Sequence, residues 1–457
     1  MNFIDLFSGC GGFSLGLLRS GMTGHLAIEK NSDAFDSLRK NLIDNKNYKF
    51  IWDESKIPLM NHDIHSLLDV HSGALKEFAD SKKIDLIVGG PPCQGFSSAG
   101  RRDSNDPRNS LAYDYLKVVS IVKPKYVILE NVKGIQYNFK NKKDVPVSHK
   151  IKAELSNLGY IPISMIEDCA DWGVPQNRKR FLLFGIDASC FNLSVSSDGL
   201  MYLGAVLEEP LKKALRKSQG VFLKKKNLNR SVSVSDAISD LKAFDSLNNV
   251  LEQAVAEDAP GNRFMRIKDL PPFKSNYQKL MRKNDNQLKS VPSGLRLARH
   301  SDRVIARFEK ILHDINDKDI SLTYSLRKGK SLPSEYANQI LKTKKAIMRV
   351  LDDKTPSVTV TTLPDDILHY DEPRILTVRE CARIQSFPDW YNFSGSYTTG
   401  GQRRKSSCPK YTQVGNAVPP LMSEGLGFFM INAMEDFIKS SNLEILEDIK
   451  NKFSKKD

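Results

Sequence analysis

Short apolar runs alternate with segments of helical spacing over the first 187 residues of the chain. Six runs have the length and composition of buried strands: residues 3–7, 24–29, 84–88, 125–132, 161–167 and 181–185. The segments with helical spacing lie between them: residues 13–18, 33–41, 114–122 and 148–158. This alternation predicts an α/β fold in which one doubly wound parallel sheet occupies residues 1–187.

The alternation stops after residue 187. Irregular periodicity then predicts a second, smaller domain over residues 188–373. Regular patterns return in residues 374–457, where Thr377 and Glu380 have the spacing of a helix capping box. An apolar helix is expected from residue 421 onward. We therefore expect residues 374–457 to end the second domain and to add a C-terminal helix to the first.

Charge favours a polyanionic partner. The chain has 68 Lys and Arg residues against 54 Asp and Glu residues, a formal net charge of +14. Such an excess points to nucleic acid first. Residues 211–230 hold eight basic residues and no acidic one, which is typical either of a phosphate-binding ribbon or of a solvated helix face. Residues 295–307 have the pattern of a basic amphipathic helix, and the β-branched run at 357–362 predicts a strand.

Cysteine usage and the N-terminus indicate a cytoplasmic protein. The six cysteines are scattered, without the spacing of a zinc site, so no metal is expected: Cys10, Cys93, Cys169, Cys190, Cys381 and Cys408. Free thiols suit a reducing compartment. The first residues lack a basic region and a cleavage site, and no apolar run is long enough to span a bilayer, so no membrane partner is expected.

A glycine turn follows the first predicted strand. The segment Ser8-Gly-Cys-Gly-Gly12 leads into a helix, which is the opening of a Rossmann-like nucleotide site. Glycines let the backbone approach a ligand, and the helix N-terminus offers free N–H groups. Glu29 ends the second predicted strand, where a carboxylate either accepts hydrogen bonds from a ribose diol or simply faces solvent.

A second turn presents a cysteine. Gly89 and Gly90 free the backbone, two prolines stiffen the exit, and Cys93 follows just past the carboxyl end of the predicted strand at 84–88. Ligands bind at that edge of an open α/β sheet. A thiol held there is either an activated nucleophile or a small buried cysteine in a tight loop.

Six segments, in this order, resemble the DNA (cytosine-5)-methyltransferases of the bacterial modification type. They are Asp5-Leu-Phe-Ser-Gly-Cys-Gly-Gly12, Gly90-Pro-Pro-Cys-Gln94, Glu130-Asn-Val132, Gln176-Asn-Arg-Lys-Arg180, Arg379-Glu-Cys-Ala-Arg383 and Gly415-Asn-Ala-Val-Pro419. The resemblance implies the Rossmann-like fold of S-adenosylmethionine-dependent methyltransferases, with a smaller DNA-recognition domain in the irregular region. It also implies methyl transfer from S-adenosyl-L-methionine to C5 of cytosine in a specific duplex sequence.

The resemblance assigns four catalytic residues. Cys93 matches the nucleophile that adds to C6 of cytosine, so that C5 becomes an enamine carbon able to accept a methyl group. Glu130 matches the acid that contacts the ring N3 and the exocyclic amine. Arg178 and Arg180 match a basic pair near the target base. The base that removes the C5 proton is not identified.

The same resemblance assigns the cofactor and DNA contacts. Residues implied to border S-adenosyl-L-methionine are Phe7, Gly9, Gly11, Gly12, Phe13, Glu29, Asp63, Ile64, Pro92, Leu111, Asn416 and Val418. Lys30 departs from the family, whose members often carry an apolar or aromatic residue there. Residues implied to contact DNA are Gln94, Ser97, Arg101, Arg102, Asn131 and Gln176. The target base must leave the duplex, and the loop at 95–107 is expected to close over it.

Partners and alternatives follow from this assignment. A monomer suffices for one flipped base in double-stranded DNA, and a cognate restriction endonuclease would act separately. One alternative is a tRNA cytosine-5 methyltransferase, although the long segment between Arg180 and Arg374 favours duplex DNA. Another is a catalytically silent DNA-binding relative, and a distant one is an NAD-dependent dehydrogenase. The recognised bases are not encoded in any readable pattern of residues 191–370.

Overall fold

The structure is a computed structural model, and the chain divides into two compact units. It describes residues 1–81, 83–92, 111–137, 145–243, 253–254, 264–265, 271–283, 292–298, 300–316, 326–327, 333–343, 348–398, 407–440, 447, 449 and 452–453. Unit 1 comprises Met1–Asp168, Lys179–Lys225 and Pro420–Asp457, and unit 2 comprises Cys169–Arg178 and Lys226–Pro419. Compared with the ranges expected from sequence, residues 188–225 belong to unit 1, and residues 169–178 belong to unit 2.

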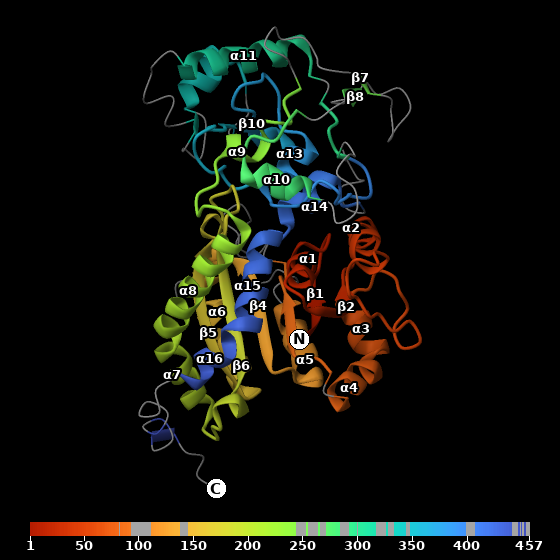
Figure 1. Cartoon of the computed structure of the whole chain (residues 1–457), viewed down its shortest axis with the longest axis vertical. Coiled ribbons are helices and arrows are strands. Elements are labelled where there is room, and N and C mark those ends of the chain that lie inside the picture. The colour runs from red at the N-terminus through yellow and green to blue at the C-terminus, as the bar shows by residue number, and fades with distance from the viewer. Residues whose placement is uncertain are drawn as a thin grey trace. The chain divides into compact units, whose positions relative to one another are not determined.

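Unit 1 is built around a six-stranded sheet (Figure 1). Its strands are β1 (Asn2–Leu6), β2 (Thr23–Ile28), β3 (Leu86–Gly89), β4 (Tyr126–Val132), β5 (Tyr160–Asp168) and β6 (Lys179–Asp187). The strand order is β2-β1-β3-β4-β6-β5. The pairs β1–β2, β1–β3 and β3–β4 are parallel, whereas β6 is antiparallel to both β4 and β5.

The prediction of an entirely parallel sheet is therefore wrong at β6. The connection from β5 to β6 is the segment Cys169–Arg178. A parallel crossover needs a dozen or more residues, so this short connection returns the chain in the opposite direction. β6 is inserted between β4 and β5 and pairs with each of them.

Helices of unit 1 pack in two groups. One group is α1 with α15, and Figure 1 shows α15 in front of the sheet. The other is a contiguous set of α3, α4, α5 and α6. The helix bounds are α1 (Gly12–Arg19), α2 (Ser32–Leu38), α3 (Ile64–Val70), α4 (Ser72–Asp80), α5 (Leu111–Val122), α6 (Val147–Asn157), α7 (Ser197–Val206), α8 (Glu208–Lys226), α15 (Pro420–Asn432) and α16 (Met434–Lys439). A doubly wound α/β fold is confirmed.

Small residues allow α1 and α15 to lie close together. A Cβ atom at Gly16 would lie 2.0 Å from Ser423 Oγ and 2.4 Å from the backbone nitrogen of Glu424. The Ser423 hydroxyl also donates to the carbonyl of Gly12 at 3.1 Å. On the other side, a Cβ at Gly427 would lie 2.3 Å from the Ser20 hydroxyl. The C-terminal helix is therefore an integral part of the first helix layer.

Unit 2 is poor in strands. Its helices are α9 (Val234–Ile238), α10 (Asn276–Arg282), α11 (Asp302–Asn316), α13 (Val378–Ile384) and α14 (Lys410–Asn416). Its strands have two residues each: β7 (Gln253–Ala254), β8 (Phe264–Met265), β9 (Arg349–Val350) and β10 (Ile367–Leu368). The strand predicted at 357–362 is wrong, because Ser357 forms only an isolated bridge with Gln176. There the backbone N–H of Val360 donates to the side chain of Gln176 and not to a neighbouring strand.

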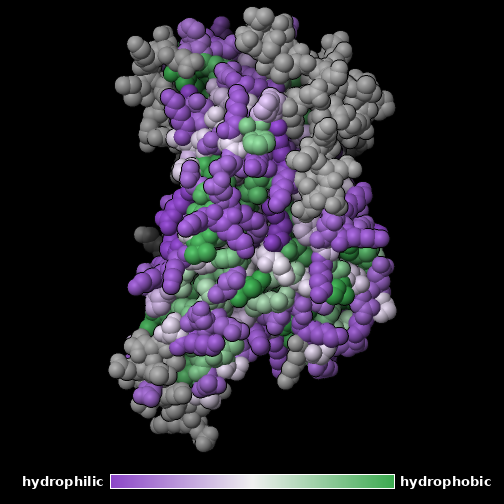
Figure 2. Space-filling view, in the orientation of Figure 1, coloured by the Kyte–Doolittle hydropathy of each residue, from purple (hydrophilic) through white to green (hydrophobic). Residues whose placement is uncertain are grey.

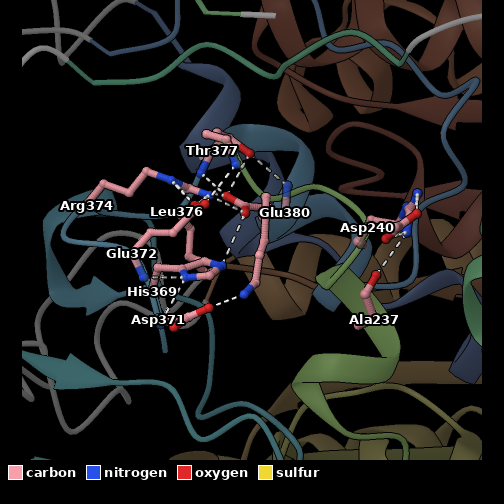
Figure 3. Close-up of polar contacts among 12 residues, drawn as sticks. Ala237, Asp240, His369, Asp371, Glu372, Arg374, Leu376, Thr377 and Glu380 are labelled. Atoms are coloured by element: carbon pink, nitrogen blue, oxygen red, sulfur yellow. Dashed lines mark hydrogen bonds and ion pairs between the residues drawn. The ribbon is translucent and has the colours of Figure 1, made fainter. Parts of the chain in front are cut away.

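A buried charge network surrounds the start of α13 (Figure 3). Thr377 and Glu380 form the predicted capping box. The Arg374 guanidinium donates to both carboxylate oxygens of Glu380 at 2.8 Å and to Glu372 at 2.7 Å. His369 Nδ1 accepts the backbone N–H of Glu372 at 3.0 Å, and burial lowers the pKa of His369 well below its usual value. A neutral imidazole thus supports the carboxylate that Arg374 holds.

Candidate functional site

Glu130 and Arg180 form an ion pair at the carboxyl edge of the parallel strands. Arg180 Nε lies 2.7 Å from Glu130 Oε1, and the two side chains are 10% and 11% exposed. The register explains the contact: Arg180 on β6 pairs with Val132 on β4, and Glu130 lies two residues before Val132 on the same face. The guanidinium also donates to the carbonyl of Lys179 at 2.9 Å. A carboxylate is thus held in a fixed orientation near the surface.

The predicted cysteine turn ends against this ion pair. β3 lies beside β4 with Gly89 opposite Leu129, so the residues that follow β3 reach the end of β4. A Cβ at Gly90 would lie 3.0 Å from Glu130 Oε2, so only glycine fits there without a shift. The Asn131 amide donates to the carbonyl of Pro91 at 3.0 Å and holds the turn in place.

Part of the predicted site lies outside the described residues. Pro92 is exposed and is the last described residue before that gap. The predicted nucleophile and four predicted DNA contacts fall in it: Cys93, Gln94, Ser97, Arg101 and Arg102. The described turn nevertheless leads directly from Gly90, beside Glu130, to the residue before Cys93.

The glycine turn after β1 has three residues with positive φ. They are Phe7 at 60°, Gly9 at 55° and Gly11 at 87°. Positive φ is uncommon for a bulky residue such as Phe7, and such strain is concentrated at functional sites. A Cβ at Gly9 would meet no atom within 4 Å, so open space lies beside this part of the turn. Gly12 and Phe13 are buried at the start of α1.

Glu29 lies next to this open space. Its two carboxylate oxygens accept the backbone N–H groups of Gly9 at 3.0 Å and of Asn31 at 2.7 Å. Burial raises the pKa of the Glu29 carboxyl, and these N–H donors act in the opposite direction. Each oxygen keeps capacity for a further hydrogen bond. A fixed carboxylate beside an open glycine turn fits the ribose diol of a nucleoside cofactor.

Asp63 begins α3. Its carboxylate accepts the backbone N–H of His65 at 2.9 Å and forms an ion pair with Lys30 at 2.6 Å. Partial burial acts to raise the pKa of Asp63, but the contacts with Lys30 and His65 outweigh it and lower the pKa. Ile64 is buried, whereas Leu111 at the start of α5 is half-buried. Lys30, the residue that departs from the family pattern, therefore has a polar partner.

In unit 2, Arg178 contacts backbone carbonyls. Its guanidinium donates to the carbonyls of Val360 at 3.2 Å, Gly415 at 2.9 Å and Ala417 at 3.4 Å. The residue is only 4% exposed. Asn416, at the end of α14, is exposed, and Val418 is half-buried. Arg178 therefore fixes the segment that carries Asn416 and Val418.

Two side chains that were predicted to contact DNA, those of Gln176 and Asn131, are buried. Gln176 is 0% exposed; its side chain donates to Gln385 at 2.8 Å and accepts the N–H of Val360 at 2.9 Å. Asn131 is 3% exposed, and its amide is occupied by Pro91 and by its own neighbour, the N–H of Val132. Both side chains are thus turned inward, where they position the backbone around them.

The sequence patterns missed two groups at these sites. Asp5 on β1 is buried and accepts the Ser14 hydroxyl at 2.6 Å. Gln385 donates to the carbonyls of Val414 at 2.7 Å and Ala417 at 3.3 Å, so it holds the same segment as Arg178. The sequence did carry a signal for Asp5, because a carboxylate inside an apolar strand is unusual. It carried no signal for Gln385, since Gln385 and Val414 are far apart in sequence.

In the described part of the chain, no group of three or more His, Cys, Asp or Glu residues is arranged to hold a metal ion. Among its helices, none has the length and apolar character needed to cross a membrane.

Comparisons with known proteins agree with this geometry. The profile of the family described as C-5 cytosine-specific DNA methylase matches residues 1–428. The chain is 32% identical to Type II methyltransferase M.DdeI of Desulfomicrobium norvegicum over 463 residues, which cover 99% of this chain and 94% of that protein. It is 27% identical to Type II methyltransferase M1.HphI of Haemophilus parahaemolyticus, over 93% of this chain and 85% of that protein.

One solved structure shares the fold. It is the crystal structure of a protein that is encoded within an E. coli prophage and described as a DNA modification methyltransferase. The TM-score is 0.59 and the identity is 24%, over 94% of this chain and 99% of that one. The expected methyltransferase fold is thereby confirmed.

Proposed function

The chain belongs to the C-5 cytosine-specific DNA methylase family and methylates C5 of cytosine in DNA; from this premise we propose that Cys93 is its nucleophile. The observation that carries the proposal is the Glu130–Arg180 ion pair, against which the Gly90-Pro91-Pro92 turn ends. In that position a thiol following the turn and the Glu130 carboxyl can address the same pyrimidine ring. We also propose that the enzyme is the modification partner of a Type II restriction endonuclease that acts separately.

In this proposal three side chains act on the target base, each with a separate role. The Cys93 thiolate adds to C6 and forms a carbon–sulfur bond, while the ring electrons move to C5. Glu130 hydrogen-bonds the ring N3 and the exocyclic amine, and so stabilises the charge that develops as the sulfur adds. Arg180 holds Glu130 in orientation through the 2.7 Å contact. Its guanidinium would then contact the O2 side of the ring. Once C5 carries the methyl group, a base takes the C5 proton, the C5–C6 double bond re-forms, and the C6–S bond breaks to release the Cys93 thiolate.

The cofactor proposed is S-adenosyl-L-methionine, which supplies the methyl group to C5 when bound. Glu29 would accept the ribose hydroxyls, since its oxygens are oriented by Gly9 and Asn31. The backbone at Phe7, Gly9 and Gly11 would lie along the methionine part. The adenine contacts are assigned to Asp63 and Ile64. The remaining residues of the proposed pocket are Gly12, Phe13, Pro92, Leu111, Asn416 and Val418.

We place target recognition in unit 2 and the chemistry in unit 1. Double-stranded DNA is the proposed substrate, bound by a monomer in the cytoplasm, with the target cytosine rotated out of the duplex. The loop at 95–107, with Arg101 and Arg102, would close over that base. Gln94 and Ser97 would contact it or its flanking phosphates. In this proposal Arg178, Gln176 and Asn131 position backbone segments and do not touch DNA.

The decisive experiment combines one substitution with a mechanism-based substrate. Bisulfite sequencing of host DNA, with and without the gene, first identifies the methylated site. Cys93→Ser should then abolish methyl transfer while affinity for DNA and cofactor is kept. Wild-type protein should form a covalent complex with duplex DNA that carries 5-fluorocytosine, because fluorine at C5 blocks the final elimination. Turnover by Cys93→Ser, or trapping without Cys93, would overturn the assignment.

The tRNA alternative is tested in the same assay. Labelled methyl transfer should occur to duplex oligonucleotides and not to tRNA. The length of unit 2 supports duplex DNA, because the long segment Lys226–Pro419 lies between the second and third stretches of unit 1. Transfer to tRNA alone would replace the proposed substrate.

A further inference from the structure

Helix α8 of unit 1 has one buried face and one basic face. It runs from Glu208 to Lys226, and its apolar residues are buried: Leu211, Leu215, Phe222 and Leu223. On the opposite side Lys213, Lys217, Gly220 and Lys224 are exposed. Their spacings of four, three and four residues place them on a single stripe along the helix. The distance from the first to the last is about 16 Å, at a rise of about 1.5 Å per residue.

The other basic residues near this stripe have partners inside the protein. Lys212 forms ion pairs with Glu208 at 3.0 Å and with Glu209 at 2.8 Å. Arg216 pairs with the buried Glu167 at 3.1 Å. Lys225 lies over the ring of Phe428.

The three lysines of the stripe differ from these residues. Within the described part of the chain, Lys213, Lys217 and Lys224 have no carboxylate at ion-pair distance. Three positive charges therefore face outward on one side of the helix. An anion that lies against them gains attraction from all three charges.

Gly220 interrupts the stripe, and packing inside the protein does not require a glycine there. A Cβ at this position would meet no heavy atom within 4 Å. Glycine in a helix interior destabilises it by about 1 kcal/mol relative to alanine, so neither helix stability nor packing favours it here. Because glycine has no side chain, a large partner can approach the helix backbone closely between the lysines.

Helix α8 runs toward the edge of the sheet that carries the candidate site. Gly204, just before α8, lies against the backbone of Pro162 near the start of β5. Arg216, in the middle of α8, contacts Glu167 near the end of β5. Glu167 is paired across the strands with Arg180, the partner of Glu130. The stripe thus starts on the flank of the sheet and ends near the carboxyl edge.

We propose that Lys213, Lys217, Gly220 and Lys224 form a phosphate-contact ridge for duplex DNA that flanks the methylated site. The proposal rests on the proposed function, and it deepens it by naming a contact outside the recognised sequence. Lysines along one face of a helix suit a regular row of phosphates, since the phosphates of one strand recur about every 3.4 Å along the duplex axis. A membrane surface is disfavoured because the apolar face of α8 is buried in unit 1. Figure 2 shows hydrophilic residues on the left flank of unit 1, where Figure 1 places α8.

The test is a triple substitution measured on two duplexes. Lys213→Gln, Lys217→Gln and Lys224→Gln are combined, and DNA affinity is measured over a range of salt concentrations. One duplex spans only the methylated site, and the other is extended by about two helical turns on each side. For the long duplex, the slope of log affinity against log salt should become shallower by about 2.7, or about 0.9 per phosphate contact. The short duplex should show little change.

A matched control removes the same charge elsewhere. Lys46, Lys76 and Lys125 are exposed in unit 1, and Lys125 precedes β4, at the opposite edge of the sheet. Their combined Gln variant should leave the slope for the long duplex unchanged. Equal slopes for the ridge variant and wild type would overturn the ridge, as would equal losses on both duplexes. Loss of binding to an acidic protein in the ridge variant, with DNA affinity unchanged, would point to a protein partner and would also overturn the ridge. If wild type methylates no duplex at all, the proposed function itself fails.

Discussion

Asp5 shows how one buried side chain makes stability depend on pH. Its carboxyl group is 1% exposed on β1 and accepts the Ser14 hydroxyl at 2.6 Å. Burial raises the pKa of Asp5 to about 7, from an ordinary value of 3.8. The folded state therefore binds this proton more tightly than the unfolded state. Its contribution to stability is fully present below about pH 4 and is lost as the pH rises through about 7.

Asp5→Asn should remove this pH dependence. The free energy of unfolding of the variant, relative to wild type, should rise between pH 4 and pH 7 by up to about 4 kcal/mol, since each pKa unit corresponds to about 1.4 kcal/mol. Above about pH 7 the difference should stay level. Thermal unfolding of both proteins across this range measures it. A difference that does not change with pH would contradict the assignment.

Two arginines that are two positions apart have separate roles. Arg180 contacts the Glu130 carboxylate, whereas Arg178 donates to carbonyls of unit 2. Arg180→Lys should lower the single-turnover rate roughly a hundredfold, because one charge-stabilising contact is lost. Arg178→Lys should mainly lower thermal stability, by about 1–3 kcal/mol, because buried carbonyls lose their donors. Single-turnover kinetics and thermal unfolding separate the two outcomes, and equal losses of rate would refute the distinction.

At the scale of elements, the contact between α1 and α15 is made by residues without bulk. Gly16 and Gly427 each face the partner helix at a distance that excludes a Cβ. The two helices come from opposite ends of the chain. In such close packing, any added atom forces the backbones of both helices to shift.

Gly16→Ala should therefore destabilise unit 1, by about 1–3 kcal/mol or more, because the added methyl group meets Ser423 and the backbone of Glu424. Gly220→Ala is the matched control, since its methyl group would enter open space. It should raise stability by up to about 1 kcal/mol, and if the ridge on α8 contacts DNA it should also weaken affinity for the long duplex. Equal melting temperatures for the two variants would show that the helices do not touch as described.

At the scale of the whole molecule, unit 1 is assembled from three separate stretches of chain. Unit 2 interrupts it between Lys225 and Pro420. All three residues proposed to act on the base, Cys93, Glu130 and Arg180, precede that interruption, yet α15 covers α1 beside the glycine turn. The unit therefore needs its last segment although no catalytic residue is assigned to it.

A chain that ends at Pro419 should fail to bind cofactor. Loss of Pro420–Asp457 exposes the apolar face of α1 and removes the hydrogen bond from Ser423 to Gly12. Co-expression of residues 420–457 as a separate fragment should restore part of the binding. Calorimetric titration with S-adenosyl-L-methionine is the measurement. Full binding by the truncated chain would show that the glycine turn forms without α15.

The sequence by itself determined the elements and the order of the chemical groups. Apolar runs located all six strands of the main sheet, and the spacing of Thr377 and Glu380 identified the cap of α13. The turn after β3 and the acid near the end of β4 were recognisable from the sequence. Glycine and proline indicate a turn, and a polar residue after an apolar run indicates the end of a strand, each within a few residues. These features depend on periodicity and turn residues, which a chain carries without reference to distant parts.

Only the tertiary structure decided which of these groups meet. The insertion of β6 between β4 and β5 and the assignment of residues 188–225 to unit 1 follow from pairing and packing with other parts of the chain, which no local pattern records. The same is true of Gln176 and Arg178, which are polar in sequence but buried in the fold. Burial and partner choice depend on contacts between residues hundreds of positions apart. The sequence therefore specifies the chemical groups, and the fold selects which of them face the substrate.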